Sequence, residues 1–393
     1  MNWVKGVGPG VDNTSMIYFD NNATTQIAPE VCEAMLPFLG RSFGNPSSAY
    51  GAGRDARSAV ERARISVAKL LGADAAEIAF TSGGTESDNW AIRGALTVDA
   101  SKKHIVTTRV EHEAVRKLCE LLQDDGYTVT WLEVDENGLL DLDNVRSSLR
   151  PDTAIVSVML ANNETGVLFP VREIGQMVHE GSDALFHVDA VNAVGKIPID
   201  LSDGAIDLLS LSAHKFHGPK GVGALYVRNG IHLPSSSVGG GQESGRRAGT
   251  EAVHQIAGLG AAAELVRDLS VVEPIRHLRD KLENTILSDV PGTYVNGSRE
   301  TRLPNTSNIS FENLNGEMIL AALDDTGICV STGSACHAGD HTASPVLQAM
   351  NIPYTRAMGS IRFSLGRYNT EDEVDRVIVE VKRVVEQLKV LGT

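Results

Sequence analysis

The sequence predicts an α/β fold, with a large domain around a mostly parallel sheet and a smaller α/β domain after it. Strand-like and helix-like stretches alternate from about residue 76 to residue 227, as in a sheet with helices on both faces. After about residue 268 the pattern changes, and helices flank shorter strand-like runs. The chain has 393 residues, 42% of them hydrophobic, so it can bury a large core and favours two domains.

The expected elements follow one another without a long linker. In the first part, the strand-like runs are residues 78–80, 105–108, 129–134, 154–160, 184–188 and 206–211, and the helix-like runs are residues 84–96, 113–124, 171–180 and 250–268. In the second part, residues 272–287 and 371–390 have helical patterns, and residues 309–311 and 361–365 have strand patterns. We therefore predict a large domain over residues 17–267 and a small domain over residues 268–393, with the first residues packing against the small domain.

Composition narrows the class of protein. Against 35 basic residues the chain has 50 acidic ones, a formal charge of −15, which argues against nucleic acid as the main ligand. No apolar run approaches membrane-spanning length, and residues 1–15 lack the basic start and apolar core of a signal peptide. We expect a cytoplasmic protein without a membrane partner. Its four cysteines contain no Cys-x-x-Cys pattern, so neither a disulfide framework nor a bound metal is expected.

Lys215 is the most informative residue. It lies in the segment Ser-Leu-Ser-Ala-His-Lys-Phe-His-Gly-Pro-Lys-Gly, residues 210–221, directly after an apolar strand-like run. A hydroxyl and an imidazole precede this lysine and a Gly/Pro turn follows it, a setting typical of a lysine that forms a Schiff base. The segment therefore predicts an enzyme that uses pyridoxal 5′-phosphate.

Other segments supply the remaining groups that this cofactor needs. The Gly-Gly-Thr-Glu turn at residues 83–86 opens a helix-like stretch, whose backbone donors and dipole can hold a phosphate. Asp189 ends one strand-like run and can pair with the pyridine nitrogen, while His112 follows another and can lie on the ring. Each signal alone has a plainer interpretation: a simple turn, a helix cap or a structural histidine. Together they supply complementary parts of one site at the ends of parallel strands.

Cys336 lies among small residues in the segment Ser-Thr-Gly-Ser-Ala-Cys-His-Ala-Gly, residues 331–339. This composition predicts an exposed, mobile loop that carries one cysteine, and an accessible thiolate there can act as a nucleophile. A buried structural cysteine, or a partial metal site with His337 and His341, is the alternative. The metal interpretation is weaker because no second cluster supplies matching ligands.

Several ordered segments resemble the NifS/IscS-type cysteine desulfurases, which belong to the class V aminotransferase group of fold type I pyridoxal phosphate enzymes. The similarity runs from about residue 17 to the end. The segments are residues 18–25, 44–48, 81–87, 111–115, 162–166, 187–190, 210–221, 239–250, 333–336 and 360–367.

The resemblance implies a role for each matching residue that faces the cofactor. Lys215 would form the Schiff base, Asp189 would pair with the pyridine nitrogen and His112 would stack on the ring. Asn163 and Asn192 would lie beside the phenolic oxygen. The residues implied as phosphate ligands are Gly84, Thr85, Ser212 and His214.

The resemblance also implies the substrate and sulfur positions. Arg362 would bind the substrate carboxylate beside Asn163, a task suited to a planar two-pronged donor. Cys336 would accept sulfur from L-cysteine as a persulfide, leaving L-alanine, and then pass the sulfur to an acceptor protein such as an iron-sulfur scaffold. Thr250 matches a residue that reaches the phosphate of the neighbouring subunit, which implies a homodimer.

Three positions depart from the family pattern. Asn192 stands where the family usually has glutamine, one methylene longer, and Glu113 stands where it often has lysine. His337 follows Cys336 in place of the commoner threonine, a pairing found in selenocysteine lyases. Against that activity, the separation of 26 residues (362 − 336) between Cys336 and Arg362 matches the desulfurases with a long loop. We predict a cysteine desulfurase, with selenocysteine lyase as the close alternative and amino acid aminotransferase as the distant one.

Overall fold

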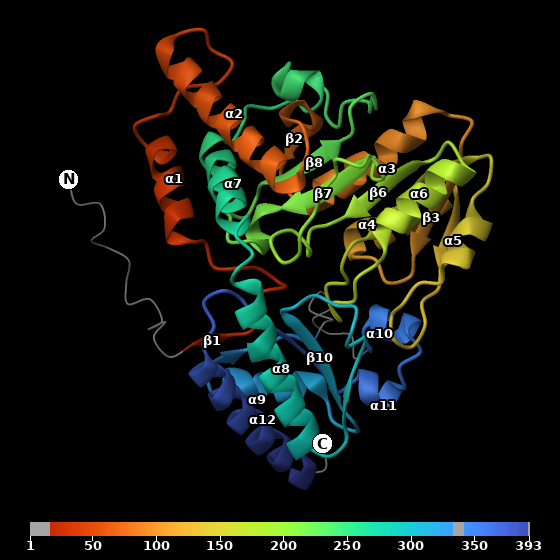
Figure 1. Ribbon diagram of the computed structural model, residues 1–393, viewed down its shortest axis with the longest axis vertical. Coiled ribbons are helices and arrows are strands. Elements are labelled where there is room, and N and C mark those ends of the chain that lie inside the picture. Colours follow the sequence, from red (N-terminus) through yellow and green to blue (C-terminus); the bar gives the residue numbers. More distant parts are fainter. Residues whose placement is uncertain (1–15, 333–341, 392–393) are drawn as a thin grey trace.

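The computed structural model describes residues 16–332 and 342–391, and its centre is a sheet of seven strands (Figure 1). In spatial order these strands are β2 (Ile78–Thr81), β8 (Gly223–Val227), β7 (Leu208–Ser212), β6 (Leu185–Asp189), β5 (Thr153–Met159), β3 (His104–Thr108) and β4 (Thr128–Leu132). All neighbours from β7 to β4 run parallel, whereas β8 is antiparallel to both β7 and β2. The sheet is therefore mostly parallel, as predicted, with one reversed strand.

Helices cover both faces because the buried strands carry apolar side chains on both sides. On β3, Ile105 packs against the helices α3 (Gly84–Val98) and α4 (Glu113–Asp124), while the next residue, Val106, belongs to the core on the opposite face. The opposite core contains the remaining helices of this part, which are α1 (Pro29–Leu39), α2 (Gly51–Leu71), α6 (Val171–Gly181) and α7 (Val253–Val266). The short helix α5 (Leu142–Ser148) contributes Val145 to the same core.

A second, smaller sheet lies beside the first (Figure 1). Its antiparallel strands are β12 (Ser360–Ser364), β10 (Thr306–Phe311) and β9 (Thr293–Val295), and its core is built with α8 (Val272–Asp289), α9 (Gly316–Asp324) and α12 (Glu371–Leu391). The first described residues join this part, because β1 (Ile17–Tyr18) pairs in parallel with β11 (Ile328–Cys329) and Phe19 enters the same core. Two short helices, α10 (Pro345–Ala349) and α11 (Tyr354–Ala357), follow in the chain, and their buried side chains join the core of the large sheet.

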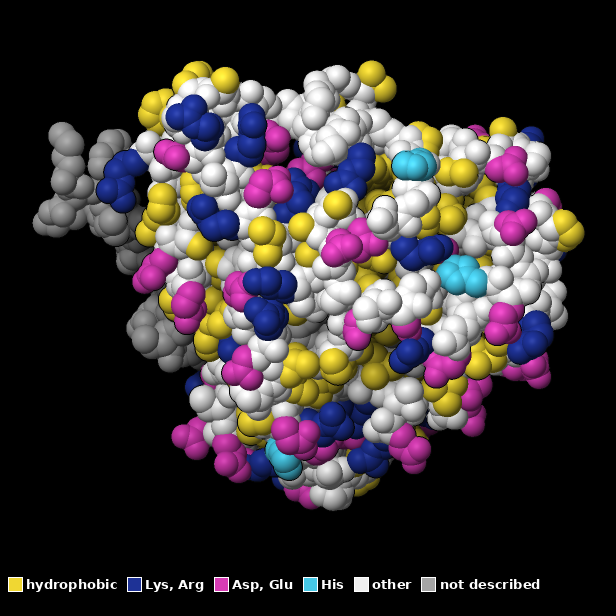
Figure 2. Space-filling view, turned by 45° about the horizontal axis from the view of Figure 1, so that its top comes forward, with side chains coloured by type: hydrophobic (Ala, Val, Ile, Leu, Met, Phe, Trp, Pro, Cys, Tyr) yellow, Lys and Arg dark blue, Asp and Glu magenta, His cyan; other side chains and the backbone are white. Residues whose placement is uncertain are grey.

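The sequence-based element bounds shift by a few residues at several ends. The helix expected over residues 250–268 is α7, Val253–Val266, and the strand expected over residues 129–134 is β4, Thr128–Leu132. Among the described residues, no helix combines the length and apolar character needed to cross a membrane. On the face shown in Figure 2, acidic and basic side chains lie interspersed.

Candidate active site

A cavity of about 330 Å³ lies at the carboxyl edge of the large sheet. Strands β3, β5, β6 and β7 are parallel, so the segments that follow them meet at one edge, and β2 ends there too because it is antiparallel to β8. Every predicted site residue that the structure describes lines this cavity, except Thr250. The residues are Gly84, Thr85, His112, Asn163, Asp189, Asn192, Ser212, His214, Lys215 and Arg362.

Lys215 ends a turn of 3₁₀-helix, Ala213–Lys215, directly after β7. Its Nζ donates to the carbonyl oxygens of Asn22 at 2.5 Å and Ala23 at 3.1 Å. The chain must turn sharply here, since a Cβ at Gly218 would lie 2.6 Å from the Ala213 Cβ. The turn therefore holds the lysine amine at the wall of the cavity, against the segment that follows β1.

Asp189 and His112 face the same cavity from neighbouring strand ends. Asp189 ends β6, and its Oδ1 accepts from the Val191 backbone at 2.9 Å. Burial raises the pKa of Asp189, although His112 and Lys215 act in the opposite direction. The Nδ1 of His112 accepts from the Ala114 backbone at 3.1 Å as the cap of α4, so its proton in the neutral ring is on Nε2. Desolvation lowers the pKa of His112, which favours this neutral form.

The start of α3 provides backbone donors for an anion. No side chain caps this helix, so the amides of its first turn point into the cavity region without partners within the helix. Gly83 has a φ of 150°, and a Cβ at Gly84 would lie 2.6 Å from Val191, so glycine is needed at both positions. Ser212 and His214 approach from the lysine turn, and burial lowers the pKa of His214 to about 4.

Arg362 and Asn163 form the side of the cavity that belongs to the smaller sheet. Arg362 is 4% exposed in the middle of β12 and donates to the Asn163 carbonyl at 3.0 Å and to Asp20 Oδ1 at 2.6 Å. Its Nε is buried without a hydrogen-bond partner among the described residues. The guanidinium is thus held by two hydrogen bonds, while its Nε–H group is left without a protein partner among the described residues.

Of the two other predicted residues, the structure describes only Thr250. Thr250 is exposed and does not line the cavity of its own chain. Its predicted contact belongs to a neighbouring subunit, so a single chain does not test it. Cys336 lies outside the described residues, between Thr332 and Thr342, as do His337 and His341.

Sequence reasoning missed several polar residues at the cavity or directly beneath it. Asn22 is 1% exposed, lines the cavity and bonds to the Asn163 carbonyl and Thr306, although only its motif had been noted. Asp88 lines the cavity one turn into α3, and Glu111 lies beneath it, accepting from Thr108 and the Met159 backbone. Burial raises the pKa of Glu111 to about 8. Asp88 could have been predicted from the sequence, because it lies four residues after Gly84 and therefore on the same face of the expected helix.

The donors and charges of this cavity fit pyridoxal phosphate. Asn192 is 4% exposed and its Nδ2 has no hydrogen-bond partner among the described residues, so a ligand oxygen can satisfy it. Asp189 offers a carboxylate for a protonated ring nitrogen, and the α3 amides offer a phosphate site. Lys215 completes the set with an amine for the aldehyde. These residues can hold the cofactor from four sides.

Comparison with known proteins identifies the family. Residues 17–377 match the model of the class-V aminotransferases, which depend on pyridoxal phosphate. The chain is 53% identical to a cysteine desulfurase of Trichormus azollae over 96% of this chain and 95% of that protein. It is 52% identical to the cysteine desulfurase NifS of Azotobacter vinelandii over 95% and 93% of the two chains.

The fold comparison agrees. A solved structure titled as a NifS-like protein matches with a TM-score of 0.88 and 39% identity, over 95% of this chain and 99% of that one. The chain therefore belongs to the class-V aminotransferase family, in the group of the NifS- and IscS-type cysteine desulfurases.

Proposed function

We propose that this protein is a cysteine desulfurase that converts L-cysteine to L-alanine and transfers the sulfur to Cys336 as a persulfide. The observation that carries the proposal is the single cavity in which Lys215, Asp189, His112 and Arg362 meet. Pyridoxal phosphate bound there would accept the electrons released at the substrate α-carbon. The residues of the chain would bind the substrate and move its protons.

Each side chain has a task that its position supports. Arg362 would bind the substrate carboxylate through its unpartnered Nε beside Asn163. The amine of Lys215 would move a proton from the α-carbon, because it lies at the cavity wall. His112, neutral with its proton on Nε2, would exchange protons with the substrate thiol. Asp189 would keep the ring nitrogen protonated.

The sulfur step requires a thiolate from outside the described residues. The Cys336 thiolate would attack the substrate sulfur and form an S–S bond. The carbon–sulfur bond would break with its electron pair left on the β-carbon, which then takes a proton. The products are L-alanine and a persulfide on Cys336, so atoms and electrons balance.

Three further features belong to this proposal. The chain would divide into a large domain over residues 17–267 and a small domain over residues 268–393, with residues 17–19 joined to the small one. It would form a homodimer in which Thr250, exposed in one chain, reaches the phosphate of the partner. The enzyme would act in the cytoplasm and pass sulfur to an acceptor protein such as an iron-sulfur cluster scaffold.

Selenocysteine lyase is the second candidate, and Glu113 was one reason for it. In the structure, Glu113 pairs with Arg116 at 3.4 Å and Lys117 at 3.3 Å on its own helix. This carboxylate therefore has a local role on α4, which favours the desulfurase. An aminotransferase would need no cysteine at position 336.

The test follows the sulfur atom. The purified protein, treated with L-cysteine, should yield L-alanine, and mass spectrometry should find one added sulfur on the peptide containing Cys336. Cys336→Ser should keep the cofactor's visible spectrum but form no persulfide, because a hydroxyl cannot accept sulfur. Lys215→Ala is the matched control that should lose turnover while Cys336 is intact. Added sulfur on Cys32, Cys119 or Cys329 would overturn the proposal, and so would full activity of Cys336→Ser.

A further inference from the structure

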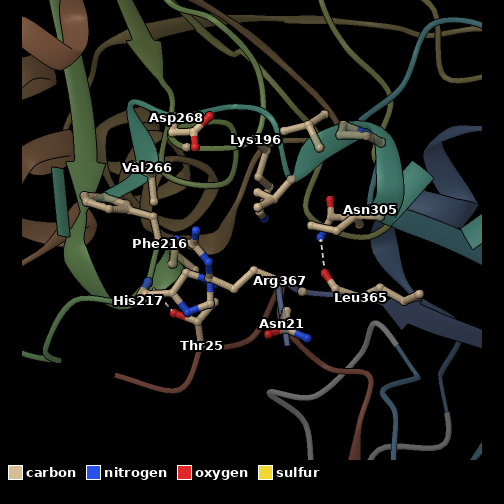
Figure 3. A pocket seen from close by; sticks show the side chains of 17 residues that line it. Asn21, Thr25, Lys196, Phe216, His217, Val266, Asp268, Asn305, Leu365 and Arg367 are labelled. Atoms are coloured by element: carbon tan, nitrogen blue, oxygen red, sulfur yellow. Dashed lines mark hydrogen bonds between the residues drawn. The ribbon is translucent and has the colours of Figure 1, made fainter. Parts of the chain in front are cut away.

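Lys196 lies between two cavities. It lines a second cavity, of about 40 Å³, together with Lys215, Asn305 and Arg367 (Figure 3). This space can hold water but is too small for a cofactor. On the other side, the Lys196 amine reaches Asn192, which lines the active-site cavity. Lys196 has no part in the chemistry proposed above, yet it contacts a residue beside the cofactor.

The Lys196 amine orients two amide side chains. Its Nζ donates to Oδ1 of Asn192 at 2.8 Å and to Oδ1 of Asn22 at 2.9 Å. The Asn22 oxygen accepts a second bond, at 3.1 Å, from Asn305. Because the amine supplies N–H donors to both contacts, each amide turns its oxygen toward Lys196.

The orientation of Asn192 determines what it offers to a ligand. With Oδ1 held by Lys196, the Nδ2 group points away from the lysine, and it is buried without a hydrogen-bond partner among the described residues. An unpaired buried donor is costly, so a ligand oxygen in the cavity would be stabilised by it. If the amide were flipped, an oxygen would face the ligand instead.

The surroundings of Lys196 disfavour the positively charged form of its amine. Burial lowers the pKa of Lys196 well below its usual value, and Lys215 and Arg362 act in the same direction. A neutral amine has two N–H groups, which matches the two amide oxygens. The lysine can therefore hold both amides without a full positive charge.

We propose that Lys196 is a positioning residue that orients the Asn192 amide so that its Nδ2 donates to the phenolic oxygen of pyridoxal phosphate. The inference rests on the proposed function, because it concerns the same cofactor. It also gives the asparagine at position 192, shorter by one methylene than the usual glutamine, a fixed orientation. Lys196 acts only through Asn192 and does not itself touch the cofactor.

The test is a pH titration of the cofactor's visible absorbance band in the holoenzyme without substrate. The band changes when the nitrogen that joins the cofactor to Lys215 loses its proton. A donor to the phenolic oxygen stabilises its anion and lowers the midpoint of that change. Lys196→Met should therefore raise the midpoint by about one pH unit, the scale of one hydrogen bond to a charged group. Asn192→Asp keeps a partner for Lys196 but removes the donor, so it should raise the midpoint at least as much.

A double-mutant cycle separates positioning from loss of charge. In an Asn192→Ala background, Lys196→Met should leave the midpoint where Asn192→Ala alone puts it. A further shift of the same size in that background would overturn the proposal, since the lysine would then act without the amide. An unchanged midpoint in Asn192→Asp would also overturn the inference, because the amide would then donate nothing to the phenolic oxygen. If Lys196→Met fails to fold, Lys196→Ala takes its place in the cycle with the same expected outcomes. Failure of the wild type to bind pyridoxal phosphate would refute the proposed function instead, so the two failures are distinct.

Discussion

Buried carboxylates have opposite electrostatic environments beside the small sheet and beside the large sheet. In the smaller part, Glu283 is fully buried but accepts from Arg302 at 2.6 and 2.8 Å and from Ser307 at 2.6 Å. Burial alone would raise the pKa of Glu283, yet these partners and Arg299 lower it below its ordinary value. The Glu283 carboxylate is therefore charged, and its charge is compensated by arginine and serine partners within the chain.

Beneath the active-site cavity, the carboxylates are not compensated. Burial raises the pKa of Asp88 well above its ordinary value, and the neighbouring Asp189 adds to the shift. The groups that lower the pKa of Glu111 are the Thr108 hydroxyl and backbone amides, none of which carries a positive charge. The difference separates a compensated structural charge from buried carboxylates with raised pKa values, a feature that is common at functional sites.

Among the buried carboxylates compared above, Asp189 should show the largest effect when it is changed to asparagine. The amide keeps the size of the side chain and an acceptor for Val191 but loses the charge that would face the ring nitrogen. We expect kcat/KM for L-cysteine to fall by about 10³-fold, the upper range for removal of one electrostatic partner. Urea unfolding of the cofactor-free protein should show no loss of stability, because no compensated pair is broken. A stability loss equal to that of a Glu283 variant would contradict the comparison.

Changing Glu283 to glutamine should have the reverse effect, a loss of stability without a loss of activity. It leaves the buried Arg302 guanidinium with a much weaker acidic partner, Asp280 at 3.9 Å, so the free energy of unfolding should fall by about 3 kcal/mol. The visible spectrum of bound cofactor and the turnover per folded molecule should be unchanged. The double variant Glu283→Met with Arg302→Met is the control, since removing both charges should recover much of the stability. No recovery in that variant would show that packing, not charge, holds this region together.

The pH dependence of stability should differ between the two regions. The folded pKa of Glu111, about 8, lies above its unfolded value, so the native state binds the extra proton. Its contribution is fully present below the unfolded pKa and is lost as pH rises toward 8. Glu111→Gln resembles the protonated acid, so from pH 5 to 8 the cofactor-free variant should gain about 3 kcal/mol relative to wild type. Urea unfolding at several pH values measures this, and a variant that loses ground as pH rises would refute it.

The smallest effect on activity is expected at Glu113, which belongs neither to the carboxylates near the active-site cavity nor to the Glu283 cluster. Its pairs with Arg116 and Lys117 are partly exposed, and such pairs contribute about 1 kcal/mol or less. Glu113→Lys should therefore change the turnover of L-cysteine and of selenocysteine by about 2-fold or less. Steady-state rates for both substrates, measured without oxygen, test this. A strong preference of the wild type for selenocysteine, narrowed by the substitution, would favour the selenocysteine lyase.

Much of the site could be predicted from the sequence because its residues follow strand ends. Asp189 ends β6, while His112 and Lys215 follow the ends of β3 and β7 by a few residues, and parallel strands bring such ends together. The fold class was confirmed, because strands and helices alternate along the chain from β2 to β6, as in a parallel sheet covered by helices. The reversed strand β8 was not anticipated, since a five-residue apolar run does not reveal its direction.

Residues that act through contacts distant in sequence could not be found in this way. Asn22 meets Lys196 and Thr306 only after both sheets are formed, and Lys196 lies in an irregular segment without periodicity. Arg362 was predicted through the resemblance, but its bond to Asp20 has no local signal. The roles of Thr250 and Cys336 stay predictions, because one concerns a second subunit and the other lies outside the described residues.

The pairing of β1 with β11 has a consequence for synthesis on the ribosome. Ile17 pairs with Ile328, and Asp20 binds an arginine at position 362. Residues 17–20 can therefore form these contacts only after residues 328 and 362 have been synthesised. The carbonyls of Asn22 and Ala23 that hold Lys215 follow closely after residues 17–20. Such distant contacts form late and slowly, and the large sheet can assemble before them. The cavity is therefore completed after the sheet that supports it, and tight cofactor capture must follow release of nearly the whole chain.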